Sequence, residues 1–456
     1  MKKYLKSAAV VMLVLVMTFT MLACGKPAMV TLDDLNKAEE EASNDNVEGN
    51  VMFTYSPAAT SADYKMAADS FINAFEAKYQ KVKVERDYTP TSDARIASAD
   101  IGDVFYFAEV STYKYAVSDR ALLPLDGFLE GFEIDKSDVY SGIYALGLVN
   151  GRLYFVPRDY NQVIFMYNKS AITEAGLNAS VKPEWTWKEF QDLAAQLYSE
   201  DGNYYPLKYN MTESSRFVPF FEAYTPSRNV WCNTTTKRIT FIDEEGTILR
   251  AVGELLDMAA QNYVVIPGVN DSADGVKGKE PIFTDIVYPN VQASGKDYDN
   301  RDVEWDIINM PLFPTPSFGC GASGVGVFSR TKNITGAAAL ALFFLTPEGQ
   351  RAFNSGTGGS VPLLKSLDVE GYDAWKYPND EKWSDKNWDA FVYLADTAST
   401  PAQVNCRMPI EVAQVISSSI STILSQDLRG SQDYVDGFTA LETKCNEIWA
   451  KLNTDF

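Results

Sequence analysis

The sequence has no histidine among its 456 residues, and this absence removes several kinds of chemistry. Without histidine, neither a Ser-His-Asp nor a Cys-His nucleophile system can be built, and the usual histidine-rich zinc sites are excluded as well. Paired carboxylates of the kind that glycosidases use remain available for acid–base work. The composition therefore excludes familiar hydrolase mechanisms but leaves carboxylate chemistry open.

Positive charge is also scarce. The chain has 40 Lys and Arg residues against 61 Asp and Glu residues, which gives a formal net charge of −21. A surface with this excess of negative charge repels phosphate groups, so no nucleic-acid partner is expected and anionic lipid is disfavoured. The composition suits a soluble exported protein.

Cysteine is rare, with five residues in the whole chain. Apart from Cys24, the cysteines stand far apart and form no Cys-x-x-Cys pair, so no metal site is expected. In an exported protein they can form one or two disulfides or remain free buried thiols, and the sequence leaves both readings open. These four residues are Cys232, Cys320, Cys406 and Cys445.

A long hydrophobic run occurs only at the N-terminus. A lysine-rich start precedes residues 7–23, which carry no charge, and the small Ala23 stands directly before Cys24. This pattern is typical of a bacterial export signal, and it is at or below the length that a spanning helix needs. We expect residues 1–23 to be a lipoprotein signal peptide and Cys24 to carry the lipid. A retained anchor helix and a plain secretory signal are the alternatives.

Few large apolar residues occur in residues 24–50, which are rich in Asp, Glu, Asn and Ala. Such a composition predicts a flexible, solvated tether between the lipid and the folded body. Leu32, Leu35 and Ala38 nevertheless have the spacing of a short helix.

The body beyond the tether has an α/β pattern, and its length favours two lobes. Strands are predicted at 51–56, 81–88 and 103–107, and an amphipathic helix follows Ser61. The order strand, helix, strand, strand indicates a largely parallel sheet flanked by helices. A second helix begins at the capping box of Thr186 and Glu189, and its apolar face requires another sheet.

A glycine-rich motif, "GCGASG" at 319–324, matches the dinucleotide-binding pattern only superficially. A dinucleotide site needs a strand before the motif and a helix after it. Here Pro314 and Pro316 precede the motif, and the apolar run after it is strand-like. We therefore expect no cofactor, and we interpret the motif as a flexible loop whose backbone can approach another group closely.

Several blocks, in order, carry a family resemblance. They are "GDVFYF" (102–107), "ALLPLDGFL" (121–129), "YFVPRDYNQVIFMYNK" (154–169), "EWTWKEFQDLAAQL" (184–197), and the stretch 310–353 followed by "GGSVP". Together they resemble the extracellular solute-binding proteins of ABC importers, which include maltose-binding proteins. The resemblance covers nearly the whole body from Val51 onward. One block departs: "KEPIFTDIVYPNVQAS" (279–294) lacks the ligand-stacking tryptophan of many relatives.

The resemblance implies two α/β lobes, a periplasmic-binding-protein-like fold that closes on a ligand between them like a Venus flytrap. We expect the first lobe to comprise 51–158 with 310–345, and the second to comprise 159–309 with 346–456. The implied partners are the transmembrane permease subunits of an ABC transporter. The expected protein is a monomer outside the cytoplasm, lipid-anchored to the cell membrane.

Ligand contacts are expected from aromatic faces and planar polar groups at strand ends and in the crossing segments. Some candidates have structural alternatives: Phe107 and Trp231 as core, Asp159 as a partner of Arg158, and Arg407 as a surface ion pair. The candidates are Tyr55, Ser56, Phe107, Glu109, Asp159, Tyr160, Asn161, Arg216, Trp231, Tyr288, Asn290, Ser323 and Arg407.

Three functions fit these observations. The resemblance favours a binding protein that captures a sugar or oligosaccharide for import, without catalysis. The same role for a peptide, polyamine, polyol phosphate or organic acid is the alternative. An exported glycosidase that works with two carboxylates is the remote one.

Overall fold

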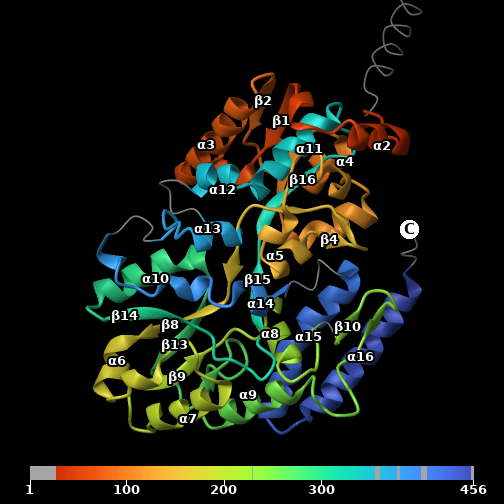
Figure 1. Cartoon of the computed structure of the whole chain (residues 1–456). Helices are drawn as coiled ribbons and strands as arrows, with labels where there is room; N and C mark the ends of the chain where they lie inside the picture. The colour runs from red at the N-terminus through yellow and green to blue at the C-terminus, as the bar shows by residue number, and fades with distance from the viewer. Residues whose placement is uncertain (1–26, 229, 355–359, 377–380, 402–407, 453–456) are drawn as a thin grey trace, which may run out of the picture.

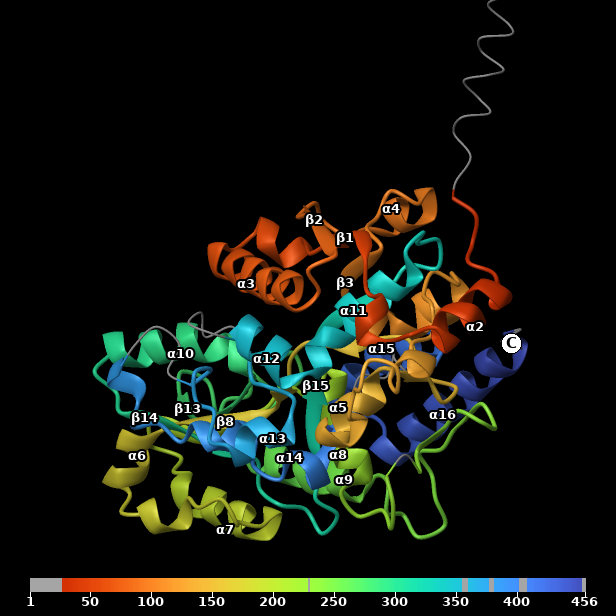
Figure 2. The same ribbon diagram turned by 45° about the horizontal axis from the view of Figure 1, so that its top comes forward.

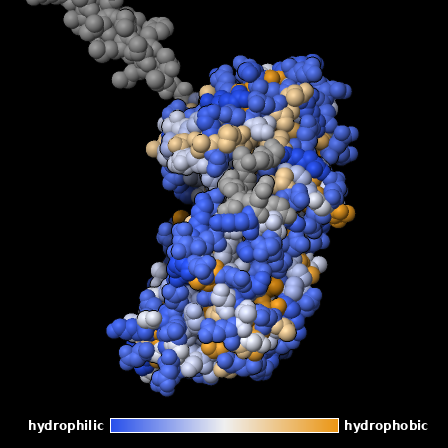
Figure 3. Space-filling view, turned by 90° about the vertical axis from the view of Figure 1, so that its left-hand side faces the viewer, coloured by the Kyte–Doolittle hydropathy of each residue, from blue (hydrophilic) through white to orange (hydrophobic). Residues whose placement is uncertain are grey.

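The computed structural model describes residues 27–228, 230–354, 360–376, 381–401 and 408–452. Two five-stranded sheets lie in the upper and lower parts of the molecule (Figure 1). We call each sheet with the elements packed on it a lobe. In space-filling view the molecule narrows between these parts, and the visible surface is mostly hydrophilic (Figure 3).

The first sheet has the order β2-β1-β3-β16-β6. The three N-terminal strands are parallel, and β16 runs antiparallel to both of its neighbours. This confirms the three strands predicted at the start of the body. The strands are β1 (Gly49–Thr54), β2 (Val82–Asp87), β3 (Val104–Ala108), β6 (Val156–Pro157) and β16 (Ser323–Val327).

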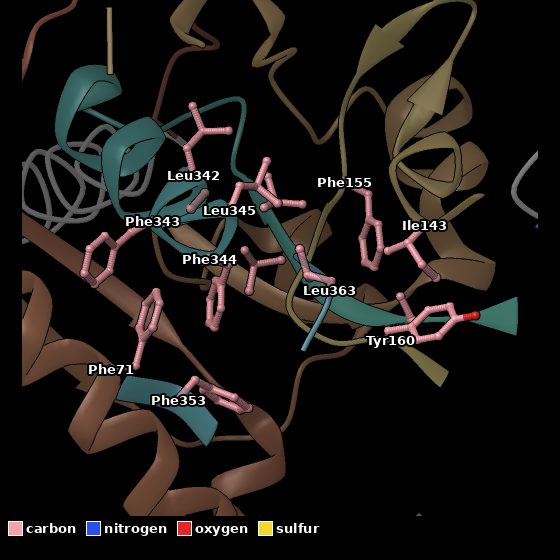
Figure 4. Packing of buried hydrophobic residues seen from close by; sticks show 14 of the residues in the cluster. Phe71, Ile143, Phe155, Tyr160, Leu342, Phe343, Phe344, Leu345, Phe353 and Leu363 are labelled. Carbon is pink, nitrogen blue, oxygen red and sulfur yellow. The ribbon is translucent and has the colours of Figure 1, made fainter. Parts of the chain in front are cut away.

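Helices cover the first sheet through aromatic contacts. Helix α3 (Ala62–Lys78) begins at Ser61, whose Oγ accepts a hydrogen bond from the amide of Tyr64. Phe71 of α3 stacks on Phe344 with ring centroids 3.8 Å apart, as Figure 4 shows. Helices α11 (Ile334–Leu342) and α12 (Pro347–Asn354) flank Phe344 in the chain, and α12 packs against α3.

The second sheet has the order β12-β9-β13-β8-β14, with β8 antiparallel to both neighbours. Helix α7 (Trp187–Leu197) begins with the predicted capping box: Thr186 and Glu189 exchange both hydrogen bonds. Its strands are β8 (Ile164–Asn168), β9 (Tyr204–Lys208), β12 (Val264–Val265), β13 (Glu280–Ile286) and β14 (Trp305–Asn309). The helices of its core include α9 (Arg250–Ala260), α15 (Ile410–Leu428) and α16 (Tyr434–Lys451).

A small sheet of order β17-β15-β7 lies where the chain crosses between the lobes (Figure 1). Strand β7 (Asn161–Gln162) leads from β6 to β8, and β15 (Phe318–Gly321) leads from β14 to β16. Strand β17 (Ser399–Pro401) pairs with β15. The glycine-rich motif therefore forms parts of β15 and β16, which corrects the expectation of a flexible loop.

The expected close approach of that motif is confirmed at Gly319. A Cβ atom there would lie 1.7 Å from the carbonyl oxygen of Ser215, at the start of helix α8 (Ser214–Glu222). Only glycine fits between the crossing strand and this helix.

Residues 27–48 differ from the sequence expectation. Helix α2 (Leu32–Glu40) buries Leu35 against the first lobe, so the flexible tether expected for 24–50 is corrected for this part. Residues 24–26 lie outside the described residues, and the residue boundaries proposed for the two lobes stay a prediction.

The remaining α-helices of the described residues connect or cover these sheets. They are α4 (Asp93–Ser98), α5 (Ser141–Leu146), α6 (Lys169–Glu174), α10 (Tyr288–Asn300), α13 (Lys365–Val369) and α14 (Ala395–Ala398). Within the described ranges, no helix is long and apolar enough to span a bilayer. Cys232, Cys320 and Cys445 are buried, whereas Cys406 lies outside the described residues.

Replacement of Gly319 by Ala is expected to lower the free energy of unfolding by about 1–3 kcal/mol, since the crossing strand or α8 must shift. Urea denaturation measures this. Gly202→Ala is the control, because its Cβ would come no closer than 3.2 Å to a neighbouring atom. Equal stability of the Gly319→Ala variant and the wild type would contradict the close approach.

A second prediction concerns Asp87 at the end of β2. Partial burial alone would raise the pKa of its carboxyl, but hydrogen bonds from Arg95, Thr54 and Thr89 lower the pKa to about 2. Because this pKa lies below the ordinary value of 3.8 for an aspartate, the stabilisation is present above pH 4 and is lost as the pH falls through 2.

Asp87→Asn should therefore cost about 2 kcal/mol of unfolding free energy at pH 7 and about half of that at pH 3. Denaturant titrations at the two pH values test this. Asp100→Asn is the control, because Oδ2 of Asp100 lies 3.7 Å from Nε of Arg95 and the Asp100 side chain is 82% exposed. This variant should change the free energy of unfolding little at either pH. An Asp87→Asn effect of equal size at both pH values would contradict the account.

Candidate functional site: a polar junction between the lobes

The site begins with a buried ion pair just before crossing strand β7. The Nη2 of Arg158 lies 3.1 Å from Oδ2 of Asp159, and each side chain is only 4% exposed. This confirms the alternative reading in which Asp159 pairs with Arg158. Buried charges of this kind persist only where further hydrogen bonds satisfy them.

Aromatic rings surround the guanidinium. The Cζ of Arg158 lies 4.9–5.6 Å from the ring centroids of Tyr55, Tyr64, Tyr106 and Phe353. Its Nη1 also donates a hydrogen bond to the hydroxyl of Tyr55. Burial alone would lower the pKa of Arg158, but Tyr55 and Asp159 raise the pKa overall, so the guanidinium stays charged.

The Asp159 carboxylate ties the crossing segments together. It accepts hydrogen bonds from the amide of Ser323 at 2.8 Å and from Oγ of Ser360 at 3.3 Å. The amide of Arg158 donates in turn to the carbonyl of Ser323 at 2.9 Å. Burial raises the pKa of Asp159, and the guanidinium and these donors oppose that rise.

Two buried polar atoms at this junction have no hydrogen-bond partner among the described residues: Nε of Arg158 and Oδ1 of Asn161. The amide nitrogen of Asn161 already donates to Oδ1 of Asp159 at 3.4 Å. A buried polar atom without a partner costs about 1–3 kcal/mol. These atoms are therefore ready for a hydrogen-bonding ligand or water.

A second polar cluster lies on the second lobe. Arg216 of α8 donates from Nε to Oδ2 of Asp285 at 2.9 Å and from Nη1 to Oε2 of Glu213 at 2.6 Å. Asn210, just after β9, donates its amide to Asp285 at 2.9 Å and its side chain to Glu213 at 2.8 Å. The cluster thus sits at the carboxyl ends of β9 and β13, which are parallel neighbours.

Crossing strand β15 connects the two clusters. Its Gly321 pairs with Asn161 of β7, and its Gly319 lies against Ser215, next to Arg216. Of the predicted residues, the structure thus brings Tyr55, Asp159, Asn161 and Ser323 together and places Arg216 close by. Ser56 follows Tyr55 directly, in a short 3-10 turn (Ser56–Ala59).

The other candidates lie elsewhere. Phe107 packs against Phe105, Tyr115 and Phe155, and Trp231 packs against Phe221 and Phe241. Tyr160 lies beside Tyr140 and donates its hydroxyl to Gln162, whereas Tyr288 lies among Trp375, Trp388 and Phe391. Glu109 is buried and Asn290 is exposed on α10. A ligand role for these residues stays a prediction, and Arg407 and Cys24 lie outside the described residues.

Sequence reasoning missed the ring of groups around Arg158, namely Tyr64, Tyr106, Ser360 and Phe353, and it missed Asp285. Tyr64 lies in the amphipathic helix predicted after Ser61, and that pattern indicates core packing only. One signal was available: Arg158 and Asp159 interrupt an otherwise apolar run, "YFVPRDY", which predicts a buried pair. Among the described residues, no group of three or more acidic or cysteine side chains is arranged to hold a metal ion.

Two α/β lobes joined by crossing strands, with polar clusters at the junction, define a two-lobed binding protein that holds a ligand between its lobes. The particular family follows from comparison. The family model for bacterial extracellular solute-binding proteins matches residues 58–351, and the chain belongs to this family. This confirms the family and the fold class predicted from the sequence, and the family is one of binding proteins rather than enzymes.

Solved structures support the same fold. The sugar-binding protein MalE from Xanthomonas citri superposes with a TM-score of 0.66 at 18% identity, over 88% of this chain and 98% of that one. The cyclic alpha-maltosyl-1,6-maltose binding protein from Arthrobacter globiformis gives 0.66 at 19% identity, over 88% and 99%. An ABC substrate-binding protein from Listeria monocytogenes in complex with cycloalternan gives 0.62 at 15% identity, over 88% and 99%. No curated protein sequence matches the chain.

The ion pair at the junction yields a stability prediction. Arg158→Met should cost about 3–5 kcal/mol of unfolding free energy, because Asp159 is left as an unpaired buried carboxylate. Arg158→Met combined with Asp159→Asn should recover part of that loss. Denaturant titration measures both variants.

The matched control is Arg152→Met. Arg152 is 43% exposed and its nearest carboxylate, Asp126, lies 3.4 Å away, so a change within about 0.5 kcal/mol is expected. If Arg158→Met were as mild as this control, the buried pair would not organise the junction.

Proposed function

We propose that this protein captures a carbohydrate between its lobes, closes on it, and delivers it to the transmembrane permease of an ABC importer. It binds reversibly as a monomer and has no catalytic turnover. The observation that carries the proposal is the polar junction, where Asn161, hydrogen-bonded to the carboxylate of Asp159, presents an unpartnered oxygen. Sugars need this chemistry, because each hydroxyl both donates and accepts.

The charge balance at the junction supports a neutral ligand. Arg158 is paired with Asp159, and Arg216 is paired with both Asp285 and Glu213. The charge of each arginine is therefore already balanced by a carboxylate, although Nε of Arg158 keeps one open donor, and this disfavours an organic acid or a polyol phosphate. A neutral polyhydroxy ligand can instead bond the remaining polar groups, namely Oδ1 of Asn161 and the exposed carboxylate of Glu213.

Stacking on the ligand would fall to tyrosine. All eight tryptophans are buried, with at most 3% of their surface exposed, and the segment 279–294 lacks the tryptophan of many relatives. Tyr64 and Tyr106 are half-buried beside the junction, and an aromatic face of this kind suits the apolar face of a sugar ring.

Three of the similar structures point the same way by their own ligands. The proteins from Xanthomonas citri and Arthrobacter globiformis are described as sugar- and cyclic-maltosyl-maltose-binding, and the protein from Listeria monocytogenes holds cycloalternan. An oligosaccharide is accordingly the first ligand class to test here. The proposal also places the mature chain outside the cytoplasm, attached to the membrane by lipid on Cys24.

Calorimetric titration of the chain from Gly25 onward with maltooligosaccharides, cyclic glucans and other neutral glycans tests the ligand class. Asn161→Ala should weaken binding of the active glycan at least about tenfold, because it removes the hydrogen bond that we propose between a glycan hydroxyl and Oδ1 of Asn161. Asn300→Ala, on the exposed end of α10, is the matched control and should bind normally.

Binding of a peptide, polyamine or organic acid, with no heat from any glycan, would reject the carbohydrate. Hydrolysis of a chromogenic glycoside by the purified chain would favour the glycosidase alternative instead.

A further inference from the structure

The N-terminal strap, which we define as residues 27–48, is fastened to the first lobe along its length. Nη1 of Arg330 donates to the carbonyl of Pro27 at 2.5 Å, and the amide of Val30 donates to the carbonyl of Ser329 at 2.8 Å. Further along, Leu35 is only 5% exposed. The strap is therefore held from its first described residue.

The far end of the strap is fastened in the same way. Asn44 donates to Oε2 of Glu133 at 3.0 Å and accepts from the hydroxyl of Tyr79 at 2.7 Å. The carbonyl of Glu48 accepts from Nδ2 of Asn333 at 2.8 Å. Residues from three separate parts of the first lobe, Tyr79, Glu133 and the stretch 329–333, thus hold one short segment.

Two glycines make room for the strap. A Cβ at Gly127 would lie 2.2 Å from the carboxyl carbon of Glu39, and a Cβ at Gly131 would lie 2.3 Å from the carbonyl oxygen of Ala42. Such close seating indicates a built contact between the strap and the segment 127–133, rather than an incidental one.

The fastening groups named above all belong to the first lobe. Figures 1 and 2 agree that α2 lies beside α11 and far from α6 and α7 of the second lobe. Only residues 25 and 26 separate Cys24 from the strap, and a chain extends at most about 3.6 Å per residue. A lipid on Cys24 would therefore lie on the order of 10 Å from Pro27.

Charge around Pro27 is mixed in the two neighbouring cavities and acidic on the strap itself. A cavity of about 450 Å³ beside the strap is lined by two acids, Asp34 and Glu41, and two bases, Lys37 and Lys332. A neighbouring cavity of about 300 Å³ is lined by three bases, including Arg120 and Arg330, and two acids. The strap itself carries seven acidic residues and one lysine between residues 33 and 48, so this face suits neutral headgroups such as phosphatidylcholine rather than an anionic bilayer.

We infer that the strap seats the first lobe on the lipid bilayer by the face around Pro27, so that the second lobe is held away from the membrane and moves relative to a fixed first lobe. This inference rests on the lipid anchor of the proposed function. The partner is the bilayer surface. Because the strap is docked on the first lobe, it fixes which face of that lobe lies next to the bilayer, which a flexible tether would not do.

Energy transfer to headgroup-labelled lipid tests this in phosphatidylcholine vesicles that carry the full lipidated chain. A dye on Lys332→Cys reports the distance of the first lobe from the bilayer. A dye on Lys188→Cys, at an exposed position of α7, reports the distance of the second lobe. Transfer should be higher at residue 332 than at residue 188. The labelled parent chain corrects for its own cysteines.

Leu35→Glu places a charge in the buried seat and should free the strap, so the difference between the two sites should be lost. Asn36→Glu adds the same charge on the exposed face of α2 and should keep the difference. Asn44→Ala provides a milder release if Leu35→Glu does not fold. Equal transfer at both sites in the parent, or an unchanged difference in both release variants, would overturn the inference.

Two checks separate this result from the proposed function. Mass spectrometry first establishes lipid on Cys24, and a chain without lipid would overturn the anchor and this inference together. Glycan titration of the same sample is independent: loss of carbohydrate binding with the transfer difference intact would reject only the ligand.

Discussion

The buried pair of Arg158 and Asp159 is the constraint on which the junction depends. An unpaired charge at this depth would cost several kcal/mol, so the surrounding groups must satisfy both ions together. They do so from separate parts of the chain. Aromatic rings from α3, β3, α12 and Tyr55, which directly follows β1, enclose the cation, and Ser323 and Ser360 donate to the anion. The pair thus fixes where the crossing strands begin, and it places Asn161 beside the Asp159 carboxylate and its hydrogen-bond donors.

Strand β15 connects the junction to the second lobe. Because Gly319 touches the first turn of α8 while Gly321 pairs with β7, a change in the angle between the lobes must pass through these few contacts. Domain closure of this kind is absorbed by a few residues at the ends of elements. The internally paired clusters on either side can then approach one ligand without bringing unpaired charge together.

Much of this architecture could be predicted from periodicity and caps. The first three strands, the helix after Ser61 and the capping box at Thr186 depend on neighbours in sequence, which a pattern records. The ring of side chains around Arg158 could not be predicted, because Tyr64 and Phe353 are nearly 300 positions apart and resemble ordinary core residues. The strap was missed for a related reason: its polar composition resembles a tether, and its seats at Gly127 and Gly131 lie far along the chain.

The central claim is that a carbohydrate closes the lobes about the junction. Pulsed electron–electron resonance between spin labels on Met66→Cys in α3 and Lys188→Cys in α7, both exposed, measures it directly. The account predicts a single distance that shortens by several ångströms when the bound glycan is added, and no shortening in the Asn161→Ala variant at the same glycan concentration. A glycan that binds while the distance between the labels stays unchanged would contradict the account.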